Sequence, residues 1–214
     1  MNNLTVLVGS CDSYNSLWKP FQICFNRYWK FNTENIFVTE KMEVPNYTEM
    51  KFRTVTSNKH SWAGRMLDGL SECKTDFIFF ILEDYFFDYS YDSEKMNIWL
   101  SDMNKYEMNR LQISPSGYQK YQKIDNIPYH QIHPSSNYLI SMQPSIWRTI
   151  FLRDNLKDGY SPWDFEIKGS SLLLNKETKT FIDKSVGNVY FNAVRRGMKK
   201  SEGWGVFMIK EGLV

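Results

Sequence analysis

Two acidic residues stand directly after the most apolar run of the chain. Phe77–Leu82 reads FIFFIL, and Glu83, Asp84 and Tyr85 follow it without a break. Such a run is typical of a strand buried on both faces. Burying carboxylates at the end of a strand costs free energy unless a cation or hydrogen bonds compensate their charge. Mg²⁺ or Mn²⁺ bridging two phosphates would supply that cation, so we expect Asp84 as the first metal ligand and Glu83 as the second. The alternative is that the two acids cap a helix or stand in water.

A second acidic segment, SPWDFEI, lies at 161–167. A carboxylate held within hydrogen-bond reach of a hydroxyl can remove its proton, and Asp164 and Glu166 are the candidates. On a strand both would face one side, whereas on a helix they would diverge by about 200°, at roughly 100° per residue. Pro162 favours a helix start, where the helix dipole favours acids without any catalytic role.

Alternating strands and helices would position these acids. The expected elements of the first half are strands at Leu4–Val8, Asn35–Thr39, Lys51–Val55 and Phe77–Leu82, and helices at Tyr14–Lys30, with Pro20 in its first turn or at its start, and Ser61–Leu70, capped by Ser61. This order predicts βαβ units and a mostly parallel sheet, in which ligands bind beyond the carboxyl ends of the strands.

The later half mixes short strands with loops. We expect a helix at Ser93–Tyr106 and strands at Arg110–Ser114, Tyr138–Met142, Thr180–Asp183 and Val189–Asn192. The 214 residues suit a single domain, since domains commonly run to about 100–200 residues. The fold class is therefore α/β.

Composition excludes several classes of protein. The 26 basic and 24 acidic residues are spread along the chain, which disfavours nucleic-acid binding. No apolar run approaches the roughly 18 residues of a membrane span, so any membrane contact would be peripheral. Arg195 and Arg196 could meet phosphates or an anionic membrane surface. The cysteines Cys11, Cys24 and Cys73 lack metal-site spacing and an even count, which indicates reduced thiols and a cytoplasmic setting.

The order of these motifs resembles a known family. A first strand ending in Gly9-Ser10-Cys11-Asp12, a helix with Trp62 and Arg65, and an apolar strand followed by Glu83-Asp84-Tyr85-Phe86 resemble the nucleotide-sugar half of GT-A-type glycosyltransferases. Three segments resemble those of a bacterial subgroup of glycosyltransferases that builds polysaccharide and lipopolysaccharide. They are ILEDYFF, SWAGRML and YLISMQPSIW. The departure is that adjacent acids replace the Asp-X-Asp motif, which leaves metal dependence open.

The resemblance implies a GT-A (Rossmann-like) fold with a mixed, mostly parallel sheet flanked by helices. It implies one domain over 1–214, with a nucleotide-sugar-binding half at 1–92 and an acceptor-binding half at 93–214. The reaction would move a hexose from a UDP-sugar to a glycan or lipid-linked glycan for surface polysaccharide, in the cytoplasm or at the inner face of the membrane. Inversion of the anomeric centre is expected.

The resemblance also implies roles for single residues. The donor-binding residues would be Ser10 and Asp12 at the base and ribose, Trp62 and Arg65 at the diphosphate, and Glu83 and Asp84 with Mn²⁺ or Mg²⁺. The acceptor-binding residues would be Gln143, Trp147 and Trp163. The base would be Asp164 or Glu166, with Asp164 slightly favoured because it adjoins Trp163.

Two other classes compete with this interpretation. A non-catalytic sugar- or nucleotide-binding module would keep the aromatic surface, and the missing second Asp supports it. A nucleotidyltransferase would also place acids at strand ends, but it should carry a Gly-rich phosphate loop with Lys or Arg after the first strand. The segment GSCDSYN is not such a loop.

Overall fold

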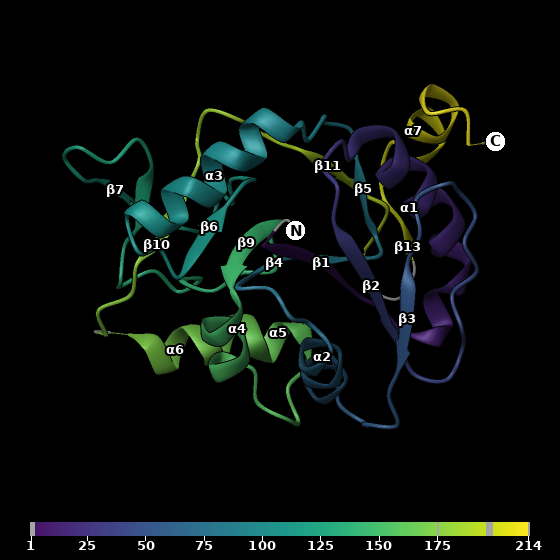
Figure 1. The fold of residues 1–214 in the computed structure, drawn as a ribbon, viewed down its shortest axis with the longest axis horizontal. Coiled ribbons are helices and arrows are strands. Elements are labelled where there is room, and N and C mark those ends of the chain that lie inside the picture. The colour runs from purple at the N-terminus through teal and green to yellow at the C-terminus, as the bar shows by residue number, and fades with distance from the viewer. Residues whose placement is uncertain (1–2, 175, 196–198, 214) are drawn as a thin grey trace.

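Nine strands form one sheet in the middle of the molecule (Figure 1). The computed structural model describes residues 3–174, 176–195 and 199–213. The strands are β1 (Leu4–Gly9), β2 (Glu34–Thr39), β3 (Arg53–Thr56), β4 (Phe77–Leu82), β6 (Arg110–Gln112), β7 (Tyr121–Lys123), β8 (His130–Ile132), β9 (Ser145–Arg148) and β10 (Thr180–Ile182). Their spatial order is β3-β2-β1-β4-β9-β6-β10-β8-β7. Of these strands, β8 and β9 run against the rest, so the sheet is mixed and mostly parallel.

Helices cover both faces of the sheet. One face carries α1 (Asn15–Tyr28), preceded by the 3₁₀ turn η1 (Asp12–Tyr14), α3 (Ser93–Lys105) and α7 (Trp204–Lys210). The other face carries α2 (Trp62–Ser71), α4 (Thr149–Asn155), and the continuous helical segment α5 (Pro162–Asp164), η2 (Phe165–Gly169) and α6 (Ser170–Leu173). Successive strand residues point to opposite faces, so Val6 and Val8 pack in the first layer and Leu7 in the second.

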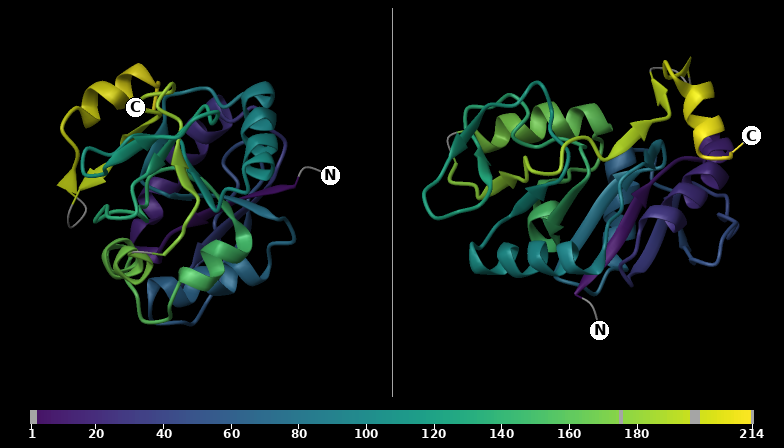
Figure 2. Two further views of the ribbon diagram at one scale, coloured as in Figure 1. Left: turned by 90° about the vertical axis from the view of Figure 1, so that its left-hand side faces the viewer. Right: turned by 90° about the horizontal axis from the view of Figure 1, so that it is seen from above.

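The end of the chain returns to its beginning. A small antiparallel sheet joins β5 (Tyr85–Phe87) to β11 (Tyr190–Asn192), and β12 (Val194–Arg195) pairs with β13 (Lys199–Lys200). Figure 2 shows α7 beside α1. The carboxylate of Glu211 is buried there, in an ion pair with Arg27 and a hydrogen bond from the Tyr28 hydroxyl. The later half therefore closes over the strand that follows the acid pair.

The carboxyl ends of β1 and β4 meet at the edge where the strand order reverses. The chain adds β2 and β3 on one side of β1 and then crosses through α2 to add β4 on the other side. Gly9 pairs with Leu82, so Ser10 and Glu83 leave the sheet side by side. A Cβ on Gly9 would lie 2.9 Å from the Met66 Sδ, so glycine permits the close approach of α2. Reversal points of this kind are where open α/β sheets bind ligands.

Most expected elements are confirmed. β4 has the predicted bounds, and the Ser61 hydroxyl caps α2 by accepting a 2.9 Å hydrogen bond from the Gly64 amide. Two expectations are wrong. Pro20 is the sixth residue of α1, because η1 begins the helical path before it. Tyr138–Met142 is not a strand, because β9 after Pro144 takes the place between β4 and β6.

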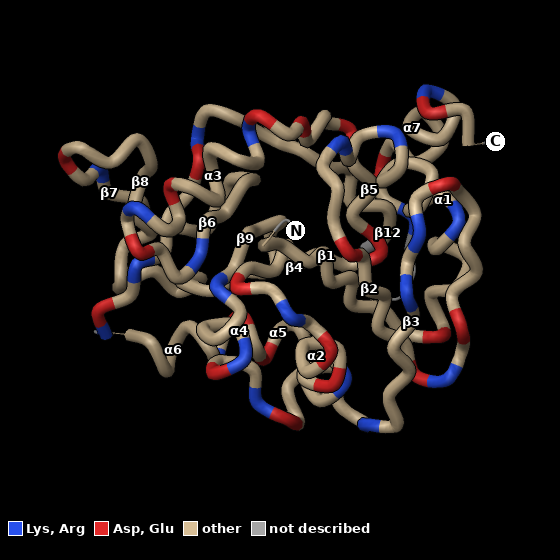
Figure 3. Tube along the Cα trace, in the orientation of Figure 1, with Lys and Arg blue, Asp and Glu red and all other residues tan. Residues whose placement is uncertain are grey.

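Charges are interspersed over the described residues. Figure 3 shows Lys and Arg alternating with Asp and Glu along the trace, with neither sign gathered on one element. None of the helices in the described ranges is long and apolar enough to cross a lipid bilayer.

Candidate functional site

Glu83, which is buried, and Asp84, which is half-buried, form an acid pair at the carboxyl end of β4. Burial raises the pKa of Asp84 to about 7. Burial, followed by the charge of Asp84, raises the pKa of Glu83 well above its usual range, against the opposing effects of a hydrogen bond with Ser10 and the charge of Arg65. The Asp84 Oδ1 is buried and has no hydrogen-bond partner among the described residues. The Ala193 amide fixes this turn by donating to the Asp84 carbonyl at 2.7 Å.

An unpartnered buried oxygen costs roughly 1–3 kcal/mol, which a bound cation or donor group would offset. Within the described ranges, no three His, Cys, Asp or Glu side chains gather into a group that could hold a metal ion. The acid pair could give a metal two carboxylates. Mg²⁺ accepts such a site when substrate phosphates and water complete its coordination, so the residues fit a cation shared with a phosphorylated substrate.

Two buried N–H groups on α2 also lack partners in the described structure. Arg65 is 6% exposed, and its Nη1 contacts the Glu40 Oε1 at 3.4 Å and the His60 carbonyl at 3.2 Å. Its Nε and the Trp62 Nε1 are buried without a hydrogen-bond partner. The Trp62 ring packs on Phe80 with centroids 5.9 Å apart. Unpaired donors beside the acid pair suit an anionic ligand, since an unpaired buried donor is otherwise rare.

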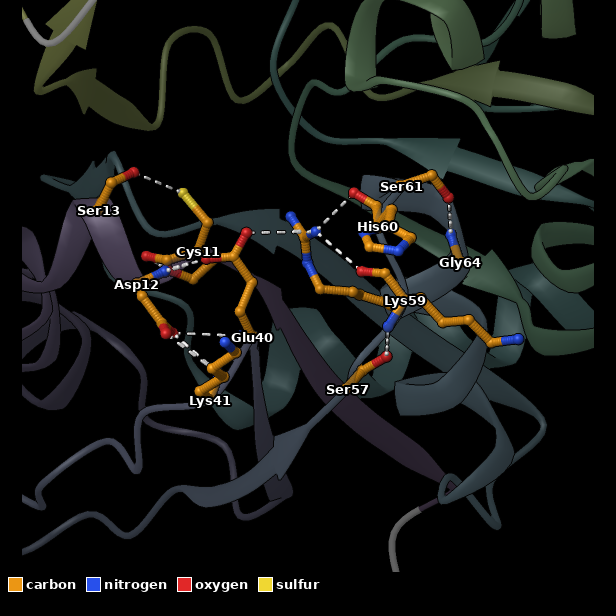
Figure 4. Close-up of polar contacts among 12 residues, drawn as sticks. Cys11, Asp12, Ser13, Glu40, Lys41, Ser57, Lys59, His60, Ser61 and Gly64 are labelled. Atoms are coloured by element: carbon orange, nitrogen blue, oxygen red, sulfur yellow. Dashed lines mark hydrogen bonds and ion pairs between the residues drawn. The ribbon is translucent and has the colours of Figure 1, made fainter.

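Asp12 makes contacts within the protein, and its expected contact with a base or ribose stays a prediction. Its carboxylate accepts hydrogen bonds of 3.1–3.3 Å from the amides of Glu40, Lys41 and Met42, and its own amide donates to the Glu40 Oε2 (Figure 4). Asp12 therefore ties the loop after β2 to η1. Ser10 is likewise engaged inside the protein, because the Trp18 Nε1 donates to its hydroxyl at 2.8 Å.

Glu40 is a site residue that the sequence reasoning missed. Its side chain is 39% exposed and stands between Asp12 and Arg65, at the carboxyl end of β2. Its position directly after a predicted strand was the available signal, because all parallel strands of the sheet end at the same edge. Cys11 is partly exposed in the same loop cluster, and burial is the main cause that raises the pKa of its thiol.

The structure separates the two candidate bases. Asp164 closes a capping box with Ser161 and pairs with Lys168 at 2.7 Å, and these contacts lower the pKa of its carboxyl to about 2. Glu166 points inward instead, where its Oε1 accepts a 2.6 Å hydrogen bond from the Met142 amide. Burial raises the pKa of Glu166. Glu166 also lies in the π-helical turn η2, a rare conformation that often marks functional sites.

A buried arginine supports the segment that holds Glu166. Arg110 is 0% exposed and lies over the Trp147 ring. Its guanidinium donates to the carbonyls of Leu139 and Ser141 at 3.3 and 2.9 Å. Burial lowers the pKa of Arg110 to about 9. The segment that was expected to be a strand is thus held by side chains, and it presents the Met142 amide to the Glu166 carboxylate.

A pair of stacked tyrosines connects the two halves of the site. The rings of Tyr85 and Tyr190 lie 4.3 Å apart, and the Tyr190 hydroxyl donates to the Gln143 Oε1 at 3.1 Å. Burial is the main cause that raises the pKa of both hydroxyls, and the charges of Asp84 and Glu166 contribute to each. The pair of rings therefore connects the acidic motif, which contains Tyr85, to Gln143. Tyr85 stands inside the acidic motif, but no local signal marks Tyr190.

The expected acceptor-binding tryptophans have opposite surroundings. Trp163 is 66% exposed at the start of α5 and can meet a ligand. Trp147 is 1% exposed, because β9 is an inner strand of the sheet and the ring is enclosed by Arg110 and Phe165. Trp147 is therefore a core residue and not an acceptor contact. Arg196 lies outside the described residues, and only the backbone of Arg195 is described.

Comparison with known proteins identifies the fold. No protein-family model and no curated protein sequence matches the chain. The structure of S. aureus TarS residues 1–349 is similar with a TM-score of 0.55 and 14% identity, over 87% of this chain and 59% of that one. The same protein in complex with UDP-GlcNAc gives a TM-score of 0.54 and 15% identity, over 98% of this chain and 65% of that one.

A third structure is similar along its whole length. CMP:2-keto-3-deoxy-manno-octonic acid synthetase complexed with CTP gives a TM-score of 0.56 and 9% identity, over 98% of this chain and 96% of that one. The chain spans 59% of the TarS 1–349 structure and 36% of the longer S. aureus TarS structure. These likenesses confirm the expected α/β fold, GT-A-like with a mixed, mostly parallel sheet, and the similar synthetase structure shares this fold.

Proposed function

We propose that this protein is a glycosyltransferase that moves a hexose from a UDP-sugar to a glycan or lipid-linked glycan acceptor for surface polysaccharide, at the inner face of the membrane. The observation that carries the proposal is the unpartnered carboxylate oxygen of Asp84, which stands with Glu83 where the strand order reverses. The unpartnered N–H groups of Trp62 and Arg65 come from the helix that crosses at this point. Together they suit a diphosphate with a divalent cation.

The proposed reaction is a single displacement. The acceptor oxygen forms a bond to the anomeric carbon as the bond from that carbon to the diphosphate oxygen breaks. The acceptor proton passes to the Glu166 carboxylate, and the nucleoside diphosphate leaves with the bonding electron pair. A divalent cation held by Asp84 and Glu83 would neutralise charge on the diphosphate, and Arg65 would donate to it. Attack from the face opposite the leaving group inverts the anomeric centre.

The contacts of the two acids favour Glu166 over Asp164 as the base. A base needs an unpaired carboxylate with a pKa not far below the working pH. Asp164 is committed to Lys168 and Ser161, and the pKa of its carboxyl falls to about 2. Burial raises the pKa of Glu166, and only one of its oxygens accepts a hydrogen bond within the described structure.

The two competing classes receive less support. A nucleotidyltransferase shares this fold, but the turn after β1 carries no lysine, arginine or glycine between Ser10 and Tyr14. A non-catalytic binding module would not require a half-buried Glu166 carboxylate, because removing a carboxylate from water is costly. The fold shared with a structure that contains UDP-GlcNAc also supports a nucleotide-sugar donor.

The direct test is the release of UDP, GDP or CMP from a panel of UDP-, GDP- and CMP-sugars, with lipid-linked glycans extracted from bacterial membranes as acceptors. We expect release from a UDP-hexose, and a fall of at least about 100-fold in Asp84→Asn and Glu166→Gln. The matched control is Asp125→Asn, which alters an exposed carboxyl in a distant turn and should keep full activity. No release from any donor, or full activity in Asp84→Asn, would contradict the proposal.

A further inference from the structure

A pocket lies in the later half of the chain, away from the acid pair. It has a volume of about 280 Å³ and lies between the turn at 136–138 and the residues Ile167, Ser171 and Leu174. Ile167 and Ser171 lie four residues apart on the helical segment of η2 and α6, and Leu174 follows directly after the end of α6. The volume is close to the lower end of the range of about 300–1,000 Å³ for small-ligand sites.

The pocket combines apolar walls with polar groups that have no internal partner. Ile167 and Leu174 are 52% and 41% exposed. Tyr138 is half-buried, and its ring lies 5.8 Å from that of the exposed Tyr118. Within the described residues, the Asn137 amide and the Tyr138 hydroxyl make no hydrogen bond. A sugar ring has apolar C–H faces and a rim of hydroxyls, so aromatic and aliphatic walls with unpaired amide and hydroxyl groups suit it.

The ligand should be uncharged. No Lys, Arg, Asp or Glu is among the residues that line this pocket in the described structure. A phosphate or an acidic sugar would leave its charge without a partner, and such a charge is costly to desolvate. A fatty acyl chain would gain nothing from the polar groups of the turn.

The pocket is continuous with the segment that carries the candidate base. The Ser170 hydroxyl accepts a 2.9 Å hydrogen bond from the Ile140 amide, and the Glu166 carboxylate accepts one of 2.6 Å from the Met142 amide. Residues 140–142 therefore run alongside the helix. Ser171 and Leu174 follow Glu166 by five and eight residues, or about 8–12 Å at about 1.5 Å per residue. The pocket is therefore too far from Glu166 for the reacting hydroxyl, and close enough for a neighbouring unit of the same oligosaccharide.

We propose that this pocket binds a neutral sugar unit of the acceptor next to the unit that receives the hexose. This inference rests on the proposed function. It identifies the acceptor as an oligosaccharide of at least two units with a neutral sugar at this position.

The test is binding to an array of bacterial oligosaccharides, with biotinylated protein clustered on streptavidin so that multivalency offsets weak single-site affinity. Ser171→Trp fills the pocket from an exposed position. Leu172→Trp is the matched control, because Leu172 is 50% exposed, adjoins Ser171 and does not line the pocket. We expect the wild type and Leu172→Trp to bind the same neutral oligosaccharides, and Ser171→Trp to lose at least about 10-fold of the signal, as loss of a well-formed contact implies.

Three results would overturn the inference: full binding by Ser171→Trp, binding of acidic glycans alone, or no binding of any neutral oligosaccharide. The thermal shift of each variant with UDP and Mn²⁺ separates this failure from that of the proposed function. If UDP raises the Tm of all three proteins but none of them binds the array, the proposed sugar-binding pocket is rejected and the proposed donor site is not. Oligosaccharide binding without any UDP shift would reject the proposed function instead.

Discussion

Removing the Asp84 carboxylate should stabilise the protein in the absence of ligands at alkaline pH. In the folded protein burial raises the pKa of Asp84 to about 7 from an ordinary value of 3.8. Between these two values the folded state holds a proton that the unfolded state has released, so stability is fully present below about pH 4 and falls as pH rises through about 7. At about 1.36 kcal/mol per pKa unit the full difference corresponds to about 4 kcal/mol. Because Glu83 titrates with Asp84, we expect at least about 1 kcal/mol of this in the variant.

The assay is urea unfolding of the wild type, Asp84→Asn and the control Asp125→Asn at pH 5 and pH 8, without nucleotide or divalent cation. Asp84→Asn should exceed the wild type at pH 8 by a larger margin than at pH 5, and Asp125→Asn should follow the wild type at both. UDP with Mn²⁺ should narrow the gap at pH 8, because only the wild type gains the cation. A margin that is equal at the two pH values, or an Asp84→Asn protein that is less stable than the wild type at pH 8, would refute the reasoning about the buried carboxylate.

Three further predictions concern the rest of the site. Glu166→Gln should lower kcat by about 10²–10⁴ and remove the acid limb of the pH profile, which burial places above pH 4.5. Asp164→Asn should keep kcat within a few-fold and lower the stability of the protein, because the capping box is lost. Equal modest losses of kcat in the two variants would reject Glu166 as the base. UDP with Mn²⁺ should slow the alkylation of the Cys11 thiol at pH 9 by at least about 10-fold. The thiols of Cys24 and Cys73 should stay unreactive, because burial raises their pKa to about 12. An unchanged alkylation rate at Cys11 would mean that the nucleotide binds elsewhere. Arg110→Met should lower the free energy of unfolding by at least about 1–3 kcal/mol, because its carbonyl acceptors lose their partner, and wild-type stability in urea would contradict the support assigned to Arg110.

Local patterns predicted the main strands and helices of the first half of the chain. The FIFFIL run predicted the bounds of β4, because a strand buried on both faces is apolar at every position. Ser61 predicted the start of α2, because a helix cap depends on residues that are close in sequence. The helical geometry at 162–164 was also expected from Pro162. On that helix Asp164 and Glu166 diverge, as the period of the helix requires.

Contacts between distant segments could not be predicted in this way. The strand that pairs β4 with β6 is β9 and not Tyr138–Met142, and that choice depends on Arg110 binding the carbonyls of the displaced segment. Burial of Trp147 follows from the same pairing. The use of Asp12 to tie the loop after β2, and the resulting place of Glu40 beside Arg65, depend on two loops that meet only in the folded protein.

The central claim is that a nucleotide diphosphate and a divalent cation bind at the carboxyl ends of β1 and β4. Thermal unfolding with UDP, GDP and CMP, with and without Mn²⁺, tests it most directly on the wild type and Asp84→Asn. A ligand at 100 times its Kd adds about 2.7 kcal/mol, and each kcal/mol raises the Tm of a chain of this size by about 2–4 °C. We predict a rise of about 5–10 °C for the wild type with UDP and Mn²⁺ together, and little or none for Asp84→Asn. The claim is contradicted if no nucleotide raises the Tm of the wild type, or if Asp84→Asn responds equally.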